Sequence, residues 1–369
     1  MKVPFVDLKV QYQSIKPQID AAIEDVLSNT AFVGGSRVKG FEDSFAALYG
    51  VKHCISTANG TDSIYIILKM LGIGAGDEVI TTAHTWISTS ETISQTGATP
   101  VFADTEPGYF TISPAAVKEK ITARTKAIIP VHLCGQMCDM DELLALAKAH
   151  DLYVIEDCAQ SHFSEYKGIR AGLMSVAASF SFYPGKNLGA YGDAGCIITN
   201  DDELAAKMRM YKNHGAIVKH EHKMEGINSR LDGLQAAILN VKLDYILDWT
   251  DKRRAAAALY TELLSEVKEV TTPIVREDTK HSFHLYMIKT PQRNELRKYL
   301  AEHGVTTGLH YPKILPVLEA YSRPQDDPAQ FSDAMGNQDQ ILSLPMYPEL
   351  SVQQIHHVAN SIKNFFREA

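Results

Sequence analysis

A lysine stands in a glycine-rich turn near the middle of the chain, in the segment Ser179–Cys196, which reads SFSFYPGKNLGAYGDAGC. The pattern predicts a buried strand, a Pro-Gly bend that presents Lys186, and a second buried strand from Cys196 to Asn200. A lysine enclosed in such a pocket can lose its proton near neutral pH and form an imine with a carbonyl. Most lysines are solvated surface charges instead, so the role of Lys186 depends on the groups around it.

A second candidate is the segment Ala58–Asp62 (ANGTD), which joins a predicted strand to a predicted helix. Free backbone N–H groups at a helix start, together with the helix dipole, can bind a phosphate. The same residues have a purely structural explanation, because Thr61 or Asp62 could simply cap the helix.

Two further polar groups lie at predicted strand ends. Trp86 follows one strand and could stack on an aromatic ring, although a lone Trp is more often part of a core. Asp157 ends the strand of YVIEDCAQ, where its carboxylate could pair with a protonated pyridine nitrogen or cap the next turn. Gln160 could then hydrogen-bond a phenolic oxygen. Together with the phosphate cradle and Lys186, these are the contacts that pyridoxal phosphate (PLP) requires.

The elements that must position these residues alternate between strands and helices through the first two-thirds of the chain, which predicts an α/β fold with a parallel or mixed sheet. The predicted strands are His53–Thr57, Glu78–Thr82, Thr99–Asp104, Ala127–Val131, Tyr153–Asp157, Ser179–Phe182 and Cys196–Thr199. Helix start signals precede Asp141–His150 (Asp139 with Glu142) and the helix that ends near Met210 (Asn200 with Glu203). Ligands in such sheets bind outside the carboxyl ends of the strands.

The pattern changes after about Asp244, which predicts a large domain of residues 1–245 and a smaller α+β domain of residues 246–369. The second part is predicted to hold a long helix, an alternating strand, a helix, proline-rich loops and a final helix. These lie at Tyr245–Val267, Phe283–Ile288, Asn294–His303, Tyr311–Pro316 with Arg323–Pro328, and Val352–Phe366.

Composition excludes several classes of protein. The net charge of −8 leaves no basic stripe for nucleic acid, and no apolar run is long enough to span a membrane. The N-terminus carries no apolar signal core. The five cysteines are scattered without CxxC spacing, which argues against a disulfide framework or a zinc site. We therefore expect a soluble, cytoplasmic protein that binds no metal.

The motifs ANGTD, GDEVI, TGATPVF, IIPVHLCGQ, EDCAQ, SFSFYPGKNLG, GDAG, NSRLD and HYP occur in this order across nearly the whole chain. In this respect the sequence resembles the PLP-dependent nucleotide-sugar aminotransferases. The resemblance implies the fold-type-I architecture, with a seven-stranded mixed sheet in the large domain, a small α+β C-terminal domain, and a homodimer with shared active sites.

The resemblance also implies roles for particular residues. Lys186 resembles the Schiff-base lysine, Asp157 the partner of the pyridine nitrogen, Gln160 the contact to the ring hydroxyl and Trp86 the stacking residue. The remaining roles implied are phosphate binding by Thr61, Asp62 and Ser181 and, from the other subunit, Asn228; a cross-subunit contact to an anionic group of the substrate by Arg230; and nucleotide diphosphate contacts by His310 and Tyr311. By their residue types alone, the last four could equally be a helix cap before Leu231–Leu239 and an interface pair.

The activity implied is ping-pong transamination from L-glutamate to C3 of a nucleotide-linked keto sugar, with a dTDP-3-keto-6-deoxyhexose favoured. The alternatives are a UDP-linked 3-keto N-acetyl sugar or uronic acid, a 4-keto sugar, and a non-enzymatic PLP-binding regulatory protein of the same fold. A branch of the family that dehydrates its substrate has histidine in place of this lysine, so Lys186 favours transamination. A Rossmann dehydrogenase is not supported, because no GxGxxG follows a strand.

Overall fold

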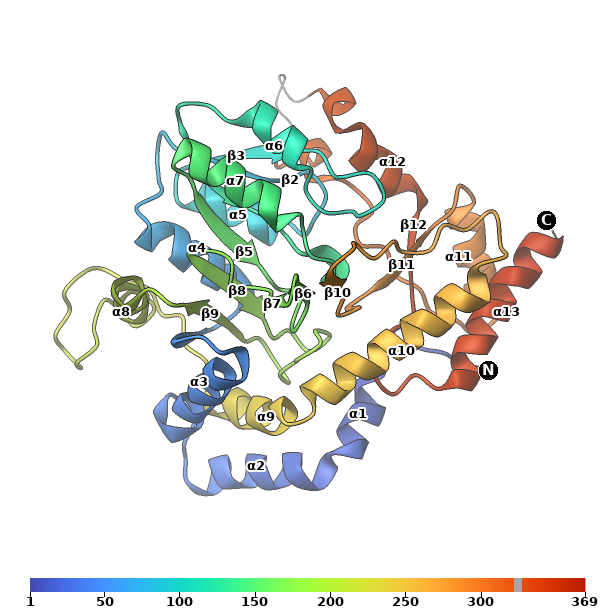
Figure 1. Ribbon diagram of the computed structural model, residues 1–369. Helices are drawn as coiled ribbons and strands as arrows, with labels where there is room; N and C mark the ends of the chain where they lie inside the picture. The colour runs from blue at the N-terminus through green and yellow to red at the C-terminus, as the bar shows by residue number, and fades with distance from the viewer. Residues whose placement is uncertain (322–326, 369) are drawn as a thin grey trace.

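The computed structural model describes residues 1–321 and 327–368. At its centre lies a seven-stranded sheet with the order β1-β9-β8-β5-β4-β2-β3 (Figure 1). Its strands are β1 (His53–Thr57), β2 (Glu78–Thr82), β3 (Thr99–Ala103), β4 (Thr125–Ile129), β5 (Tyr153–Asp157), β8 (Ala177–Ser181) and β9 (Gly195–Thr199). Strand β9 pairs antiparallel with β1 and β8, and the other pairs are parallel. The predicted mixed sheet is confirmed.

Neighbouring residues of the central strands divide between two apolar cores, one on each face of the sheet. Ile80 and Ile198 belong to the core under α3, α6, α7 and α9, whereas Val79 and Ile197 belong to the core under α4, α5 and α8. This division follows from the two-residue period of a strand. The covering helices are α3 (Gly35–Tyr49), α4 (Gly60–Met70), α5 (Ser88–Gln95), α6 (Pro114–Lys120), α7 (Met140–His150), α8 (Asp202–Tyr211) and α9 (Gly233–Leu243).

The predicted strand positions are right within two residues. Strands β4 and β8 begin two residues earlier than predicted, at Thr125 and Ala177. Ala177 and Ala178 of β8, and Lys126 of β4, carry little β propensity, so the apolar pattern did not extend to the starts of these strands. Short strands outside the main sheet are β6 (Glu165–Tyr166), β7 (Ile169–Arg170) and β10 (Thr279–Lys280), and 3₁₀ turns cover Leu133–Gly135, Leu315–Val317 and Pro328–Phe331.

Helix capping corrects three of the predictions. Asp139 caps α7 as expected, since its Oδ1 accepts the N–H of Glu142 at 3.3 Å. The cap of α8 is Asp201 rather than Asn200, whose side chain accepts the N–H of Lys52. Asn59, not Thr61 or Asp62, caps α4. The cap of α9 is Asp232, so Asn228 to Arg230 do not cap that helix. In α8, α4 and α9 the N-cap lies one to four residues from the predicted cap.

A second lobe forms around an antiparallel pair of strands, β11 (Tyr286–Lys289) and β12 (Ile341–Leu344). Its helices are α10 (Ile246–Leu264), α11 (Arg293–Glu302), α12 (Ser332–Gln340) and α13 (Val352–Glu368), and α10 lies beside α13 (Figure 1). Among the described residues, no helix is both long and apolar enough to cross a membrane.

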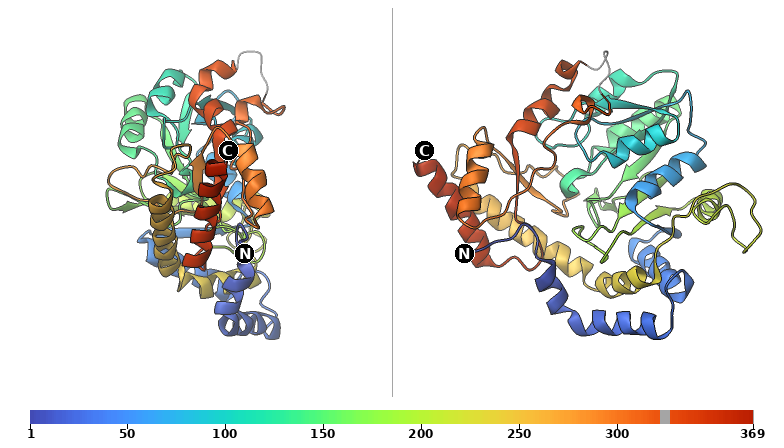
Figure 2. Two further views of the ribbon diagram at one scale, coloured as in Figure 1. Left: turned by 90° about the vertical axis from the view of Figure 1, so that its right-hand side faces the viewer. Right: turned by 180° about the vertical axis from the view of Figure 1, so that it is seen from behind.

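Two segments cross the proposed division at residue 245. Val3 is fully buried in the core of the second lobe, and the N-terminus lies beside α13 in all three views (Figures 1 and 2). Conversely, Ile314, Leu315 and Phe331 pack with Ala83 and Phe102 of the large sheet. Most of the predicted loop Arg323–Pro328 lies outside the described residues. The N-terminal residues lead into helices α1 (Leu8–Ser14) and α2 (Lys16–Ser28). We keep the division at residues 245/246 as a proposal.

Candidate active site

A cavity of about 590 Å³ opens at the carboxyl ends of the central strands. Most of the residues singled out from the sequence line it: Thr61, Trp86, Asp157, Gln160, Ser181, Lys186, His310 and Tyr311. Asp62, Asn228 and Arg230 do not. The first of these carries a backbone N–H that is bonded to Asn59 Oδ1. The other two are exposed on the surface of this chain.

Lys186 lies in a short turn between β8 and β9. The turn is closed by two backbone hydrogen bonds, from Lys186 N–H to Tyr183 O and from Ala190 N–H to Phe182 O, both 2.8 Å long. Within the described part of the chain, Lys186 Nζ has no hydrogen-bond or ion-pair partner. Burial lowers the pKa of Lys186 to about 8, and the charge of Asp157 partly opposes this shift. The amine can therefore gain or lose a proton near neutral pH.

Asp157 is the last residue of β5, and its side chain is 5% exposed. One carboxylate oxygen, Oδ2, accepts the hydroxyl hydrogen of Thr89 at 2.8 Å, and Oδ1 accepts the N–H of Ala159 at 3.1 Å. Neither donor is charged, so the negative charge of a buried aspartate would have no cationic contact apart from Lys186 across the cavity. Such a carboxylate suits a protonated ring nitrogen.

The start of α4 forms a cradle for an anion. Asn59 takes the N–H of Asp62, while the N–H groups of Gly60 and Thr61 make no hydrogen bond within the described residues. The hydroxyl groups of Thr61, Ser88 and Ser181 line the same end of the cavity. Gly60 is needed there, because a Cβ on it would lie 2.8 Å from Ser181 Cβ. N–H groups, hydroxyl groups and the helix dipole together suit a phosphate.

Aromatic and amide groups form the walls of the cavity. Trp86 is 57% exposed, and its ring lies 5.6 Å from that of Tyr311 between centroids. Gln160 Oε1 accepts the N–H of Cys134 at 2.7 Å, and its Nε2 donates to the Tyr311 hydroxyl at 3.1 Å. One N–H of the Gln160 amide is then left for a ligand.

The far wall contains groups that sequence reasoning missed. Phe5 stacks on His310 with 5.4 Å between ring centroids, and Met346 lies beside them. Burial, with the nearby charge of Lys186, lowers the pKa of His310 to about 4, and burial also lowers the pKa of His284. This wall therefore carries no positive charge at neutral pH. The motif PFVDL could have indicated Phe5, whereas nothing local marked Thr89 as the partner of Asp157.

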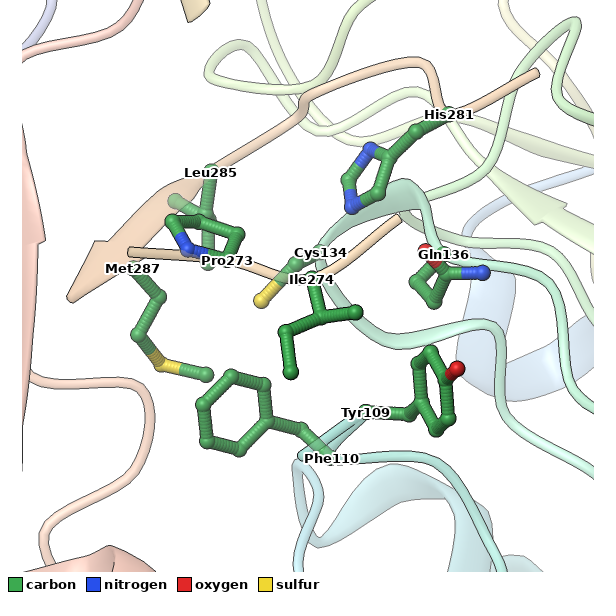
Figure 3. Close-up of a pocket in the computed structure, with 9 residues that line it drawn as sticks. All are labelled: Tyr109, Phe110, Cys134, Gln136, Pro273, Ile274, His281, Leu285 and Met287. Carbon is green, nitrogen blue, oxygen red and sulfur yellow. The ribbon is translucent and has the colours of Figure 1, made fainter. Parts of the chain in front are cut away.

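A second cavity lies behind Leu285, which lines both (Figure 3). Its volume is about 10 Å³, which is room for about one water molecule. Figure 3 shows mainly apolar side chains around it, among them Phe110, Ile274 and Met287. It is too small for a cofactor, so the ligand site is the large cavity.

Three residues at the end of β5 and beside it are potential metal ligands: the ligand atoms of His132, Glu156 and Cys158 lie within 4.8 Å of one another. Their hydrogen-bonding atoms are already used. His132 Nδ1 accepts the N–H of Cys138, and its Nε2 contacts Glu156 Oε1 at 3.1 Å. Glu156 accepts three further hydrogen bonds, from the N–H groups of Gly172 and Met174 and from Ser175 Oγ. This cluster is a satisfied internal hydrogen-bond network.

The residues around the large cavity fit PLP. An anion cradle lies at the start of α4, a buried carboxylate ends β5, and an amine without a partner stands in the turn after β8. These are the groups that the phosphate, the ring nitrogen and the aldehyde of PLP need. The fit rests on donors and acceptors that the protein leaves open.

Comparison with known proteins agrees with this geometry. Residues 13–363 match the model of the DegT/DnrJ/EryC1/StrS aminotransferase family. The crystal structure of Streptomyces venezuelae DesV in complex with a ketimine intermediate superposes with a TM-score of 0.97 at 40% identity, covering 99% of this chain and 98% of the other.

Three curated relatives cover almost the full chain. A pleiotropic regulatory protein of Geobacillus stearothermophilus is 46% identical, over 100% of this chain and 99% of its own. The dTDP-3-amino-3,4,6-trideoxy-alpha-D-glucose transaminase of Streptomyces venezuelae is 40% identical, over 99% and 96%. The UDP-2-acetamido-2-deoxy-3-oxo-D-glucuronate aminotransferase of Pseudomonas aeruginosa is also 40% identical, over 98% and 100%.

Proposed function

The chain belongs to the DegT/DnrJ/EryC1/StrS aminotransferase family of PLP-dependent enzymes, and we propose that it moves an amino group from L-glutamate to C3 of a nucleotide-linked keto sugar. The observation that carries this proposal is the placement of Lys186, Asp157 and the α4 cradle around one cavity. A dTDP-3-keto-6-deoxyhexose is the substrate we favour.

Lys186 is the proposed catalytic residue. PLP bound here would supply the aldehyde that accepts the amino group and a ring that withdraws electrons from the reacting carbon. Lys186 would hold the cofactor covalently and, once displaced by the amino donor, carry a proton to and from the reacting carbon. Its pKa of about 8 suits this work, because a general acid–base group is most effective when its pKa lies near the working pH.

The other residues would bind and orient the cofactor. Asp157, held by Thr89 and Ala159, would keep a proton on the ring nitrogen. The N–H groups of Gly60 and Thr61 and the hydroxyl of Ser181 would hold the phosphate. Trp86 would cover one face of the ring and exclude water from it, while Gln160 would donate to the ring hydroxyl.

We further propose that a second copy of the chain completes each site. Asn228 and Arg230 are exposed on their own chain and lie outside its cavity. Arg230 has no ion pair with any residue the structure describes. An arginine left free on the surface can reach an anionic group of a substrate in a partner subunit through its bidentate fork.

The character of the cavity supports a neutral deoxysugar over a uronic acid. Among the described residues that line the cavity, Lys186 is the one lysine or arginine, and it is assigned to the cofactor. The far wall offers Phe5, Met346 and an uncharged His310, which suit a methyl group better than a carboxylate. A UDP-linked 3-keto N-acetyl sugar or uronic acid is the alternative, supported by the relative that is named as an aminotransferase of a UDP-linked 3-oxo-glucuronate.

A regulatory role without turnover is the second candidate, because one relative is named as a pleiotropic regulatory protein. A protein that has abandoned turnover does not need an unpartnered lysine facing a buried aspartate, and this chain keeps Lys186 and Asp157. The catalytic proposal is therefore the stronger one.

An absorbance spectrum of the purified protein, taken before and after addition of L-glutamate, tests the proposal. We expect a visible band from lysine-bound cofactor that disappears with glutamate as 2-oxoglutarate forms. The aminated enzyme should then convert a dTDP-linked 3-keto sugar faster than a UDP-linked or 4-keto one. Absence of the band even with added PLP would contradict the role of Lys186, and a stable band with no turnover would favour the regulatory protein.

A further inference from the structure

Helix α9 is joined to the turn that carries Lys186 by two hydrogen bonds. Lys242 Nζ donates to the carbonyl oxygen of Gly189 at 2.6 Å. About two turns earlier on the same helix, Gln235 Oε1 accepts the N–H of Tyr191 at 2.8 Å. Both contacts fall within five residues of Lys186, so α9 fixes the second half of the turn.

Lys242 is an unusual choice for this place. Its side chain is fully buried, and no carboxylate lies within ion-pair distance among the residues that the structure describes. Its nitrogen instead lies 4.1 Å from the centre of the Tyr191 ring, and Glu349 attracts it from farther away. Burying a lysine amine is costly, and an apolar side chain would fill the same space without that cost. The contacts to Gly189 and Tyr191 offset part of this free-energy cost.

Gly189 also packs closely against Pro184, at the beginning of the turn. A Cβ on Gly189 would lie 2.3 Å from the carbonyl oxygen of Pro184, so the two ends of the turn are packed against each other. Gly189 cannot shift toward Pro184 without displacing the segment that holds Lys186. A group that fixes the Gly189 carbonyl therefore also limits the movement of Lys186.

We propose that Lys242 is a positioning residue for Lys186, holding the Gly189 carbonyl and the Tyr191 ring so that the amine stays aimed into the cavity. The inference rests on the proposed catalytic role of Lys186. Asn187 also anchors the turn, since it donates to Ser282 O at 3.1 Å and contacts His284 Nδ1 at 3.2 Å. The turn is thus held by α9 on one side and by the segment before β11 on the other.

Hydrogen exchange of the cofactor-free protein tests the anchoring without reference to activity. In Lys242→Met, which keeps the length of the side chain but removes the donor, amides of residues 183–192 should exchange about tenfold faster because the turn opens locally. Lys207→Met, an exposed change on α8, is the matched control and should leave this peptide unchanged. Unchanged exchange in Lys242→Met would overturn the proposal, as would a rise spread evenly over the chain.

Steady-state kinetics of the enzyme with PLP bound are the second measurement. Lys242→Met should lower kcat about tenfold and change the KM for the amino donor less than about twofold, because only the aim of Lys186 is disturbed. If Lys242→Met does not fold, Tyr191→Leu removes the ring alone and should raise exchange of residues 183–192 about threefold, with Tyr191→Phe at the wild-type rate. Equally fast exchange of residues 183–192 in Tyr191→Leu and Tyr191→Phe would overturn the proposal. If the wild type proves inactive, the exchange data still decide whether Lys242 anchors the turn.

Discussion

Glu156 and Asp157 are neighbours on β5, and both are buried, yet the protein treats the two carboxylates differently. Glu156 points to the inner face of the sheet, where it meets His132 and three further donors. Asp157 points to the cavity, where its two protein donors are neutral. A saturated carboxylate stabilises the fold, whereas one with open hydrogen-bonding capacity is available to a ligand. The alternation of a strand allows adjacent residues to take these separate roles.

Ionisation supports the same distinction. Because His132 Nδ1 accepts the N–H of Cys138, its Nε2 carries the hydrogen that faces Glu156, and this contact lowers the pKa of Glu156 although burial alone would raise it. The charge of Glu156 is therefore stabilised by donors within the protein. At Asp157 the balancing charge is to come from Lys186 or from the bound cofactor.

Lys186→Ala should produce the largest effect, because it removes the side chain that we propose both attaches the cofactor and carries the proton. We expect transamination to fall by about 10⁴-fold or more, with the circular dichroism spectrum unchanged. The measurement is 2-oxoglutarate formation from L-glutamate. Substantial residual turnover would contradict the role of Lys186.

Asp157→Asn should come next. The amide oxygen can still accept one of the two hydrogen bonds, from Thr89 or from Ala159, but the side chain carries no charge to hold a proton on the ring nitrogen, so we expect kcat to fall about 10³-fold. The melting temperature should change little. Loss of stability without loss of activity would make Asp157 resemble Glu156 and would remove the contrast between them.

Glu156→Gln should show the reverse pattern. Replacing a buried carboxylate that accepts hydrogen bonds from four groups should cost about 3 kcal/mol, or roughly 10²-fold in the folding constant, measured by urea unfolding. Since the pKa of Glu156 is lowered in the folded state, its contribution is present above the unfolded value of 4.5 and is lost as the pH falls. The variant should therefore lose less stability than the wild type on acidification. The kcat of the folded fraction should stay within about threefold of wild type.

Thr89→Val, which removes one donor to Asp157 at nearly constant volume, should lower kcat by about tenfold or less, in line with the loss of one hydrogen bond to a charged group. Thr92→Val on the same helix is a suitable control, since the Thr92 hydroxyl bonds only to backbone carbonyls of α5. Equal effects of the two changes would mean that the helix, not Asp157, is affected.

The smallest effect concerns pH. Uptake of PLP by the cofactor-free protein should accelerate as the pH rises through about 8, because only the unprotonated amine of Lys186 attacks an aldehyde. Because Asp157 raises this pKa, Asp157→Asn should move the midpoint to lower pH, as measured by stopped-flow absorbance. A midpoint that stays in place would mean that the two groups do not interact.

Much of this contrast could be predicted from sequence. Strand β5, the turn of Lys186 and the start of α4 each have a local pattern, and their common place at the carboxyl edge follows from the sheet topology. Thr89 and Lys242 were not predicted, because their roles depend on which groups the fold brings to them from 68 and 53 positions away. Asn228 and Arg230 carry a proposed role that a single chain cannot display.

The burial of Val3 in the second lobe has a consequence for the order of folding during synthesis. The cores around the large sheet draw mainly on residues between Ile15 and Trp249, so they can form while the chain is still growing. The second lobe joins Val3 to Val358 and Ile362, which are synthesised later. The segment that holds Val3 and Phe5 can therefore pack only after α13 has been synthesised. The cofactor cradle is therefore assembled before the wall that would face the sugar.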